Sequence, residues 1–393
     1  MRKIELLAPA GDLDKLKLAL TYGADAVYIG GKSFSLRYFA SNFTLDNIKE
    51  GVEFAHKLNK KVYVATNMVM HKEDEPGLLD YLKSLKDMGV DAVIASSLYI
   101  LKLAKTINLE VHMSTQLSTL NVDTVNLFYK LGSPRIVLGR ELTLEEIREI
   151  KANTEADIEV FIHGGMCSSY SGKCMLSNYM ASRDPNRGGC AHSCRWKYFV
   201  YQNERQIGEE NEYISMSSKD LVGIEEVPYL IESGVGSLKI EGRMKSYNYL
   251  AYIISAYRKA IDDYYEKNGF ALEEYKKLLY YGENREAGHG FFYGNVTRNE
   301  SQLELMDKFS KAGEFIGIIR GKNPENSRII MEVKNKILTG QDYLVLSPGG
   351  LIRRVKIDKM FYKDNEVDVF TVAGENIEII ADIDLQEFDL IHI

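Results

Sequence analysis

The chain has 393 residues, of which 45% are hydrophobic and 27% charged, a composition typical of a folded globular protein with room for two domains. Its net charge of -7 argues against a protein that binds nucleic acid over its whole surface. No stretch reaches the roughly 18 uncharged apolar residues that cross a bilayer, and the first residues lack the apolar core of a secretion signal, so we expect a cytoplasmic protein without membrane contact.

Short β-branched runs alternate with amphipathic helical stretches through the first two thirds of the chain. Eight such units predict an α/β fold, a (β/α)8 TIM-type barrel over residues 1–270. A doubly wound open sheet is the alternative, but its GxGxxG fingerprint is missing after the first run. The eight strands are expected within residues 4–11, 26–31, 61–67, 92–96, 110–116, 135–140, 158–164 and 237–243.

The connection after the seventh predicted strand is unusually long and spans about residues 164–236. It contains every cysteine of the chain, a predicted hairpin of residues 196–203 against 211–218, and a predicted helix at 223–234. Long loops in compact domains are usually functional, and TIM barrels carry their active sites where strands run into such loops. We therefore expect the functional site on this face of the barrel.

The last third of the chain has a different pattern. Residues 271–308 contain a stretch rich in glycine and asparagine, which predicts a linker. From residue 309 to residue 393, short strands separated by closely spaced turns predict a small antiparallel β-barrel domain.

Polar side chains occupy one face of three predicted barrel strands. Side chains alternate across a strand, and the apolar set must face the helices, so the polar set points into the barrel. The polar set comprises Glu110, His112, Ser114 and Gln116 on the fifth strand, Glu159 and His163 with Phe161 on the seventh, and Ser237, Lys239, Glu241 and Arg243 on the eighth.

Unpaired charge inside a barrel is costly, so these side chains predict either a catalytic site or a buried ion-pair network in which Lys239 neutralises Glu159 or Glu241. His163, at the end of its strand, is the leading candidate for acid-base chemistry. The candidate catalytic residues are His163, His112, Glu159, Lys239 and Glu241. The candidate residues for holding carboxylate or phosphate oxygens of a substrate are Arg140, Arg243, Gln116, Arg187 and Arg195.

The four cysteines lie within 28 residues with the spacing C-x6-C-x15-C-x3-C, at Cys167, Cys174, Cys190 and Cys194. In a reducing compartment, clustered thiols are more often metal ligands or redox groups than disulfides. Structural zinc prefers two tight C-x2-4-C pairs, whereas one 4Fe-4S cluster needs four thiolates and tolerates irregular spacing. The spacing favours a 4Fe-4S cluster, with zinc and free or redox thiols as alternatives. Residues 160–200 also carry five Lys or Arg against one Asp, an excess that either offsets thiolate charge or attracts an anionic substrate.

The segments EVFIHGGMCSSYSGKCMLS (159–177) and RGGCAHSCR (187–195), with LLAPAG (6–11) and KIEGRMKS (239–246), resemble the collagenase-like peptidase family. The resemblance covers nearly the whole chain, and it is strongest to members associated with prephenate-dependent 5-hydroxylation of the tRNA wobble uridine. It implies that the four cysteines hold a 4Fe-4S cluster. It also implies prephenate, a small dicarboxylate, as a cofactor and the tRNA anticodon loop as a partner.

Three functions are therefore weighed: an RNA-modifying hydroxylase acting on tRNA or another RNA, a peptidase as the family's name implies, and a non-catalytic assembly or electron-transfer protein. The last would work with a protein partner or as a homo-oligomer. The chain has no HExxH or GxSxG motif and no cysteine outside the cluster, which favours the first. Residues 310–393 carry 11 Lys and Arg against 14 Asp and Glu, so we expect RNA affinity to be modest and salt-sensitive.

Overall fold

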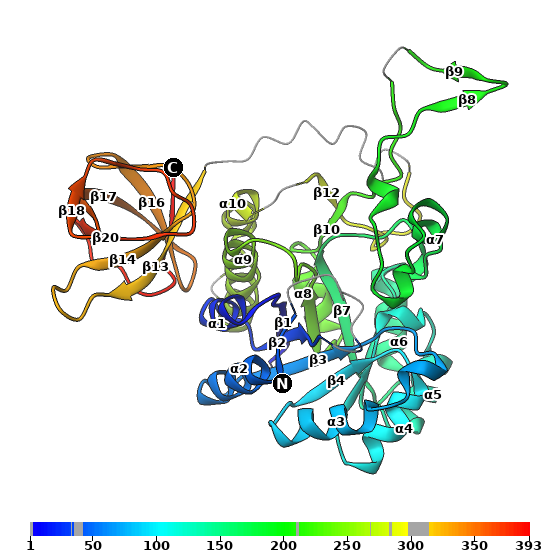
Figure 1. The fold of residues 1–393 in the computed structure, drawn as a ribbon. Coiled ribbons are helices and arrows are strands. Elements are labelled where there is room, and N and C mark those ends of the chain that lie inside the picture. The colour runs from blue at the N-terminus through cyan, green and yellow to red at the C-terminus, as the bar shows by residue number, and fades with distance from the viewer. Residues whose placement is uncertain are drawn as a thin grey trace. The chain divides into compact units, whose positions relative to one another are not determined.

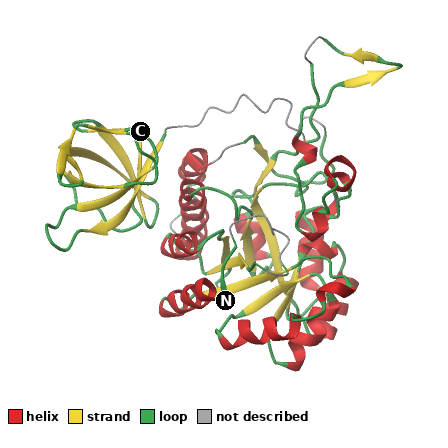
Figure 2. Ribbon diagram, viewed as in Figure 1, coloured by secondary structure: helices red, strands yellow, loops and turns green. Residues whose placement is uncertain are grey.

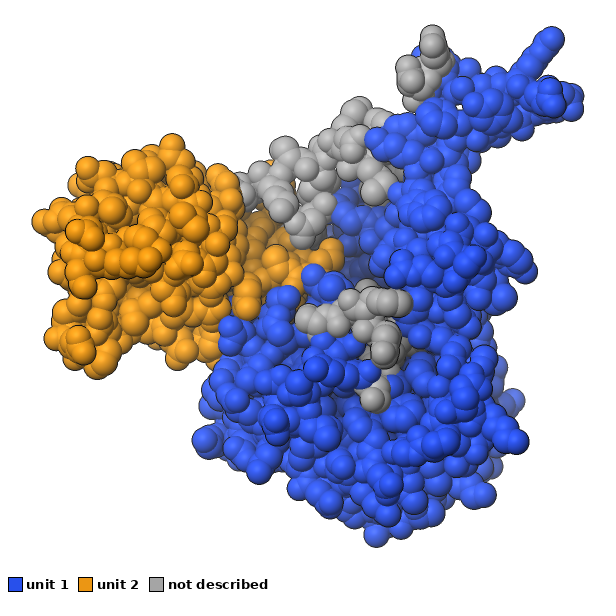
Figure 3. Space-filling model, in the orientation of Figure 1, with its two compact units in different colours: residues 1–20, 24–244, 285–309 blue, residues 21–23, 245–284, 310–393 orange. Residues whose placement is uncertain are grey.

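The structure is a computed structural model that describes residues 3–32, 34, 42–209, 212–267, 269–282, 285–297 and 314–393. The chain divides into two compact units (Figure 3), the first comprising residues 1–20, 24–244 and 285–309 and the second residues 21–23, 245–284 and 310–393. The predicted start of the C-terminal domain at residue 309 lies outside the described residues. Among the helices that the structure describes, none has both the length and the apolar character needed to cross a membrane.

Eight parallel strands of the first unit form a closed barrel in the order β11-β1-β2-β3-β4-β5-β6-β7, because β11 also pairs with β7 (Figures 1 and 2). Closure excludes the doubly wound alternative, and each predicted strand region contains one strand, so the (β/α)8 prediction is confirmed. The strands are β1 (Glu5–Pro9), β2 (Ala26–Gly30), β3 (Lys61–Thr66), β4 (Ala92–Ala95), β5 (Val111–Met113), β6 (Arg135–Val137), β7 (Asp157–Gly164) and β11 (Ser237–Ile240).

Helices connect successive strands, and several begin at a side-chain cap. Thr143 caps α6 and forms a reciprocal capping box with Glu146, which satisfies backbone donors that a helix end would leave unpaired. Each helix buries one apolar face, as the 3.6-residue period requires. The helices that follow these strands are α1 (Leu13–Thr21), α2 (Leu45–Lys57), α3 (Leu78–Asp87), α4 (Leu98–Thr106), α5 (Val122–Leu131), α6 (Leu144–Ala152) and α8 (Val227–Glu232).

The long connection after β7 contains the helix α7 (Leu176–Ala181), several short 3-10 helices and the hairpin of β8 (Val200–Gln202) with β9 (Arg205–Ile207). It ends at β10 (Asp220–Val222), which pairs antiparallel with the end of β7 and parallel with β12 (Ala287–Gly288). We call residues 165–219 the cysteine insertion. Because β10 pairs with β7, the cysteine insertion leaves the barrel at the end of β7 and returns to the same strand.

The hairpin prediction was wrong in its pairing. β8 pairs with β9, and only an isolated bridge between Tyr198 and Ile214 joins the two stretches that were expected to pair. The reason is local, because Asn203 and Glu204 both have positive φ (47° and 65°) and form a tight two-residue turn.

The second unit contains the helices α9 (Tyr247–Glu266) and α10 (Leu272–Gly282) and an antiparallel β-barrel. α10 lies in the stretch that glycine and asparagine content marked as a linker. Six strands close the barrel in the order β16-β21-β13-β14-β20-β17, since β17 also pairs with β16, and this confirms the predicted C-terminal architecture. The strands of this unit are β13 (Phe315–Lys322), β14 (Ile329–Val333), β15 (Ile337–Leu338), β16 (Asp342–Ser347), β17 (Leu351–Tyr362), β18 (Asn365–Val367), β19 (Val369–Phe370), β20 (Asn376–Ala381) and β21 (Leu390–His392).

Candidate active site

A buried ion-pair network runs through the interior of the (β/α)8 barrel. Lys239 Nζ lies 2.6 Å from Glu159 Oε1, and Arg135 Nη1 lies 3.5 Å from Glu159 Oε2. Glu159 is fully buried and Lys239 nearly so. The network that the sequence offered as one alternative is therefore present, with Glu159 as the partner of Lys239. Removal of one member would leave an uncompensated charge in a low-dielectric interior.

Glu5 extends this network toward the start of the strands. Its carboxylate accepts hydrogen bonds from Arg135, from Tyr63 Oη at 2.8 Å and from Ser237 Oγ at 2.9 Å. Burial raises the pKa of Glu5, but the charge and hydrogen bonds of Arg135 outweigh burial, and the pKa is lowered. Glu5 is therefore ionised. Its ion pair with Arg135 lies at the start of strands β1 and β6, at the opposite end of the strands from the cavity described next.

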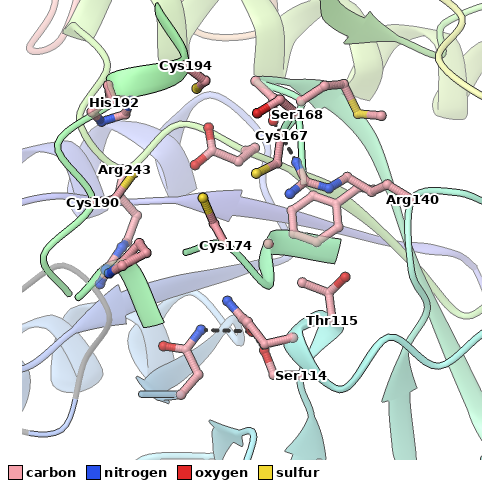
Figure 4. Close-up of a pocket in the computed structure, with 18 of the residues that line it drawn as sticks. Ser114, Thr115, Arg140, Cys167, Ser168, Cys174, Cys190, His192, Cys194 and Arg243 are labelled. Carbon is pink, nitrogen blue, oxygen red and sulfur yellow. Dashed lines mark hydrogen bonds between the residues drawn. The ribbon is translucent and has the colours of Figure 1, made fainter. Parts of the chain in front are cut away.

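A cavity of about 230 Å³ lies where the barrel strands run into the cysteine insertion (Figure 4). We call it the thiol cavity. Its lining combines residues from β2, β3, β4, β5, β7 and β11, or just after them, with residues of the insertion. The predicted site residues that line it are Cys167, Cys174, Cys190, Cys194, Gln116, Arg140, Arg195, Lys239, Glu241 and Arg243. The barrel therefore brings together most of the predicted residues on the face where the active site was expected.

All four cysteines are free thiols that line this cavity. The amide N–H of Ser169 donates to Cys167 Sγ at 3.4 Å, and that of Leu176 donates to Cys174 Sγ at 3.3 Å. Such bonds stabilise thiolates and sulfur-ligated metals. Among the described residues, no three His, Cys, Asp or Glu side chains form a group able to hold a metal ion as they stand. The features that suit a sulfur-ligated metal are the shared cavity and the amide–sulfur bonds.

Burial also raises the pKa of the Cys167 thiol. The Ser169 amide and the positive charge of Arg140 act in the opposite direction, whereas the neighbouring thiols Cys174 and Cys194 raise it further. A bound metal would favour the thiolate.

Neighbouring side chains fix the backbone around the first two cysteines. The Asn186 amide donates to the carbonyl of Cys174 at 2.8 Å and accepts from its N–H at 3.4 Å. Glu141 accepts bonds from both the N–H and the hydroxyl of Ser171, which adopts a left-handed backbone conformation (φ 46°). These contacts fix the path of the insertion, so the thiols keep their positions relative to the barrel.

Cationic side chains surround the thiol cavity. Arg140 Nη1 donates to the carbonyl of Gly165 at 2.5 Å, and its guanidinium carbon lies 5.0 Å from the centre of the Phe161 ring. Charged groups of Arg195, Glu241 and Asp220 all lie within 4 Å of the position that a side-chain carbon would take at Gly165, so they converge on this point of the backbone. Among the described residues, four cations line the cavity and Glu241 supplies the one lining carboxylate, an excess of positive charge that suits an anionic ligand.

Both predicted histidines lie outside the cavity lining. His112 is buried beneath it, where its Nε2 lies 2.9 Å from Glu110 Oε1 and its ring packs edge-on against Tyr63. His163 is 2% exposed on β7 and faces Val222 of β10 across the ladder. The β7–β11 pairing shifts register between Lys239 and Ile240, so simple alternation along β7 does not carry past Phe161. Their proposed acid-base roles remain predictions.

Sequence reasoning missed several lining residues. His192 lies between two cysteines in the CAHSC segment, and its position there was the available signal. Asn67 directly follows β3, donates to Gln116 Oε1 at 3.3 Å and could have been found as a polar residue at a strand end. Phe161 and Tyr28 line the cavity as aromatic surfaces near the Lys239 ammonium, at 5.2 Å and 4.6 Å from the ring centres. The sequence placed Phe161 on the inward face of its strand, whereas nothing in the sequence marked Tyr28.

Arg187 does not line the cavity, although it was predicted to contact substrate. Its guanidinium instead forms a bidentate pair with Asp74 and donates to the carbonyl of Val69 at 2.9 Å. This pair fastens the cysteine insertion to the loop that follows β3.

Replacing Asp74 with asparagine is expected to lower stability near pH 7 and to have a smaller effect near pH 3. The hydrogen bonds from Arg187 hold the pKa of Asp74 below its usual value of 3.8, so the pair contributes fully above that value and is lost as pH falls through the lowered one. Urea unfolding of both proteins at the two pH values measures the difference. Asp80→Asn, which removes an exposed partner of Lys83, serves as the control. An equal gap at both pH values would contradict the assignment.

Comparison with known proteins relates the chain to one family. The model of Peptidase family U32 matches residues 11–302, and that of the Peptidase family U32 C-terminal domain matches residues 312–392. The tRNA hydroxylation protein P1 of Bacillus subtilis is 43% identical over 356 residues, which cover 88% of this chain and 84% of that protein. A 23S rRNA 5-hydroxycytidine synthase of Escherichia coli is 38% identical over 68% of this chain and 40% of its own length. A protein named collagenase from Porphyromonas gingivalis is 33% identical over 66% of each chain.

Proposed function

The chain belongs to peptidase family U32, and we propose that within this family it is an RNA hydroxylase that acts at carbon 5 of the tRNA wobble uridine. Relatives named for tRNA hydroxylation match most of the chain, and a relative named for hydroxylation of ribosomal RNA matches two thirds of it. The proposal includes prephenate as a co-reactant and a 4Fe-4S cluster as the resident cofactor. Because tRNA is the substrate, we place the reaction in the cytoplasm.

One observation carries the proposal: four thiols and four cations share one cavity at the mouth of the barrel. A guanidinium binds a carboxylate through two parallel N–H donors, so Arg140, Arg195 and Arg243 are suited to the two carboxylates of prephenate. Lys239, tied to Glu159 below, adds a fixed positive charge at the base of the same cavity. A neutral peptide backbone would gain little from this charge.

Cys167, Cys174, Cys190 and Cys194 would hold the cluster. When bound, a 4Fe-4S cluster supplies one-electron redox chemistry. The protein contributes the amide donors of Ser169 and Leu176 to sulfur and the positive charge of Arg140 near Cys167. Both features compensate negative charge on thiolates.

The acid-base steps of the proposed reaction need a group that can hold a proton, and the thiol cavity offers a carboxylate. Glu241 is the predicted catalytic carboxylate that lines the thiol cavity, so we assign to it proton exchange with the dicarboxylate bound there. Unpaired bases of an anticodon loop can leave the stack and enter a protein pocket, which a base within a duplex cannot do without disrupting its pair.

A strain that lacks this gene is expected to lose 5-hydroxyuridine derivatives from its tRNA, as measured by mass spectrometry of digested total tRNA. The wild-type gene should restore them, and a gene encoding Arg140→Ala should restore about one tenth or less, because one charge-assisted contact to the co-reactant is gone. An unchanged nucleoside profile, combined with peptide cleavage by the pure protein, would instead support a peptidase. Activity that appears only after cell extract is added would point to a required protein partner.

A further inference from the structure

A second cavity, of about 520 Å³, lies on the other side of the Cys167 turn. Met166, Cys167, Ser168 and Leu176 line both cavities, so this turn and the start of α7 form a shared wall. The remaining lining comes from Ser169, from residues 216–220 and from residues 288–296. The second cavity falls within the roughly 300–1,000 Å³ of small-molecule sites, and the thiol cavity is smaller.

The walls of the second cavity are fixed by hydrogen bonds. Arg285 donates to Asp220 Oδ1 at 2.9 Å, to Ser217 Oγ and to the carbonyl of Ser218 at 2.9 Å, which ties the segment before β10 to the segment that leads into β12. A side-chain carbon added at Gly290 would lie 3.5 Å from Met166 Cε, so the residues after β12 approach the shared wall closely. The cavity is thus built into the first unit rather than left by a loose loop.

The two cavities differ in chemical character. The thiol cavity is lined by Arg140, Arg195, Lys239 and Arg243, whereas the described residues around the second cavity include one cation, Lys219, and one carboxylate, Asp220. Both of these are paired, Lys219 with Glu286 at 3.4 Å and Asp220 with Arg285. Most of the remaining side chains of the second cavity are flat or flexible and apolar, namely Met166, Leu176, Met216, Phe291 and Val296. Such a lining suits a neutral planar ring rather than an anion.

We propose that the second cavity receives the unpaired pyrimidine base of the RNA, while the thiol cavity holds the small dicarboxylate. This inference rests on the proposed function and assigns the two reactants to two separate spaces. Base and dicarboxylate would then both border the turn that carries Cys167, where the two linings share residues. The aromatic ring of Phe291 provides a surface on which a base can stack, and Lys219 at 23% side-chain exposure lies where a flanking phosphate can reach it.

The test compares binding of two probes to the full-length protein purified without air: an anticodon stem-loop RNA with an unpaired uridine, and prephenate. Phe291→Ala and Ser218→Phe, which remove the stacking surface and fill the cavity, are expected to weaken RNA binding about tenfold or more and to leave prephenate affinity within about twofold. Phe291→Tyr keeps the aromatic surface and should bind RNA as the wild type does. Arg140→Ala should show the opposite pattern, with prephenate binding weakened and RNA binding retained.

Unaltered prephenate binding also shows that each cavity variant is folded. RNA binding that survives both Phe291→Ala and Ser218→Phe would overturn the assignment, as would loss of both ligands in every variant, which would mean a single shared site. If the wild type itself prefers the unpaired stem-loop no more than a duplex RNA of equal length, the proposed function fails, and that outcome is distinct from failure of the two-cavity assignment.

Discussion

Replacing Cys174 with serine is expected to deprive anaerobically purified protein of most of its iron and labile sulfide and to lower RNA hydroxylation by about 100-fold or more. A serine hydroxyl does not ionise near neutral pH and is a poor ligand for iron, so the proposed cluster would lose one of its four attachments. The Leu176 amide would also lose the sulfur to which it now donates. Iron and sulfide analysis, with electron spin resonance of the reduced protein, measures the effect.

Met175→Leu is a matched control for this experiment. Met175 is adjacent to Cys174, 54% exposed and carries no thiol, so its replacement should leave both metal content and activity unchanged. Wild-type protein that contains one zinc ion and neither iron nor sulfide would overturn the cluster proposal. The cavity would then need a different chemical interpretation.

Replacing Glu159 with glutamine is expected to lower the free energy of unfolding by about 3–5 kcal/mol, because it leaves Lys239 and Arg135 facing each other without the carboxylate between them. Urea denaturation measures this loss. The double variant Glu159→Gln with Lys239→Met should lose clearly less unfolding free energy than the sum of the two single variants. The reason is that Lys239→Met removes the ammonium that Glu159→Gln leaves without a partner.

The matched control for this pair lies on the protein surface. Glu50 is 55% exposed and contacts Lys17 at 2.7 Å, so Glu50→Gln should cost no more than about 1 kcal/mol. Equal losses for Glu50→Gln and Glu159→Gln would show that the buried network contributes no more than an exposed pair. The network would then be a consequence of the fold and not a determinant of its stability.

Most of the fold was predictable because its signals are local. Each barrel strand is a short β-branched run, and the closely spaced turns after residue 313 are a property of consecutive residues. The position of the cysteines was predictable for the same reason, since the chain carries them directly from β7 onto the face where barrel active sites lie. The α10 helix was not expected because the nearby glycines and asparagines dominated the signal, although they follow the helix.

What could not be predicted depends on contacts between distant residues. Arg187 belongs to a basic segment, but its partner Asp74 is 113 residues away and is not distinguished from other surface aspartates. Glu5 and Arg135 meet inside the barrel from strands 130 residues apart. The register shift beside His163, which is buried outside the lining of the thiol cavity, leaves no trace in the residue pattern. The second cavity combines residues near 167, 218 and 290, which no spacing rule connects.

The pairing of β10 with β7 bears on how this protein can diversify. Leu221 lies opposite Gly164 and Val222 opposite His163, so the cysteine insertion starts and finishes at adjacent points of one strand. A segment anchored in this way can lengthen, shorten or exchange its tip with little penalty to the scaffold, because closing a longer loop costs only a slowly growing entropy. We therefore expect chimeras that swap residues 196–216 between homologues to fold.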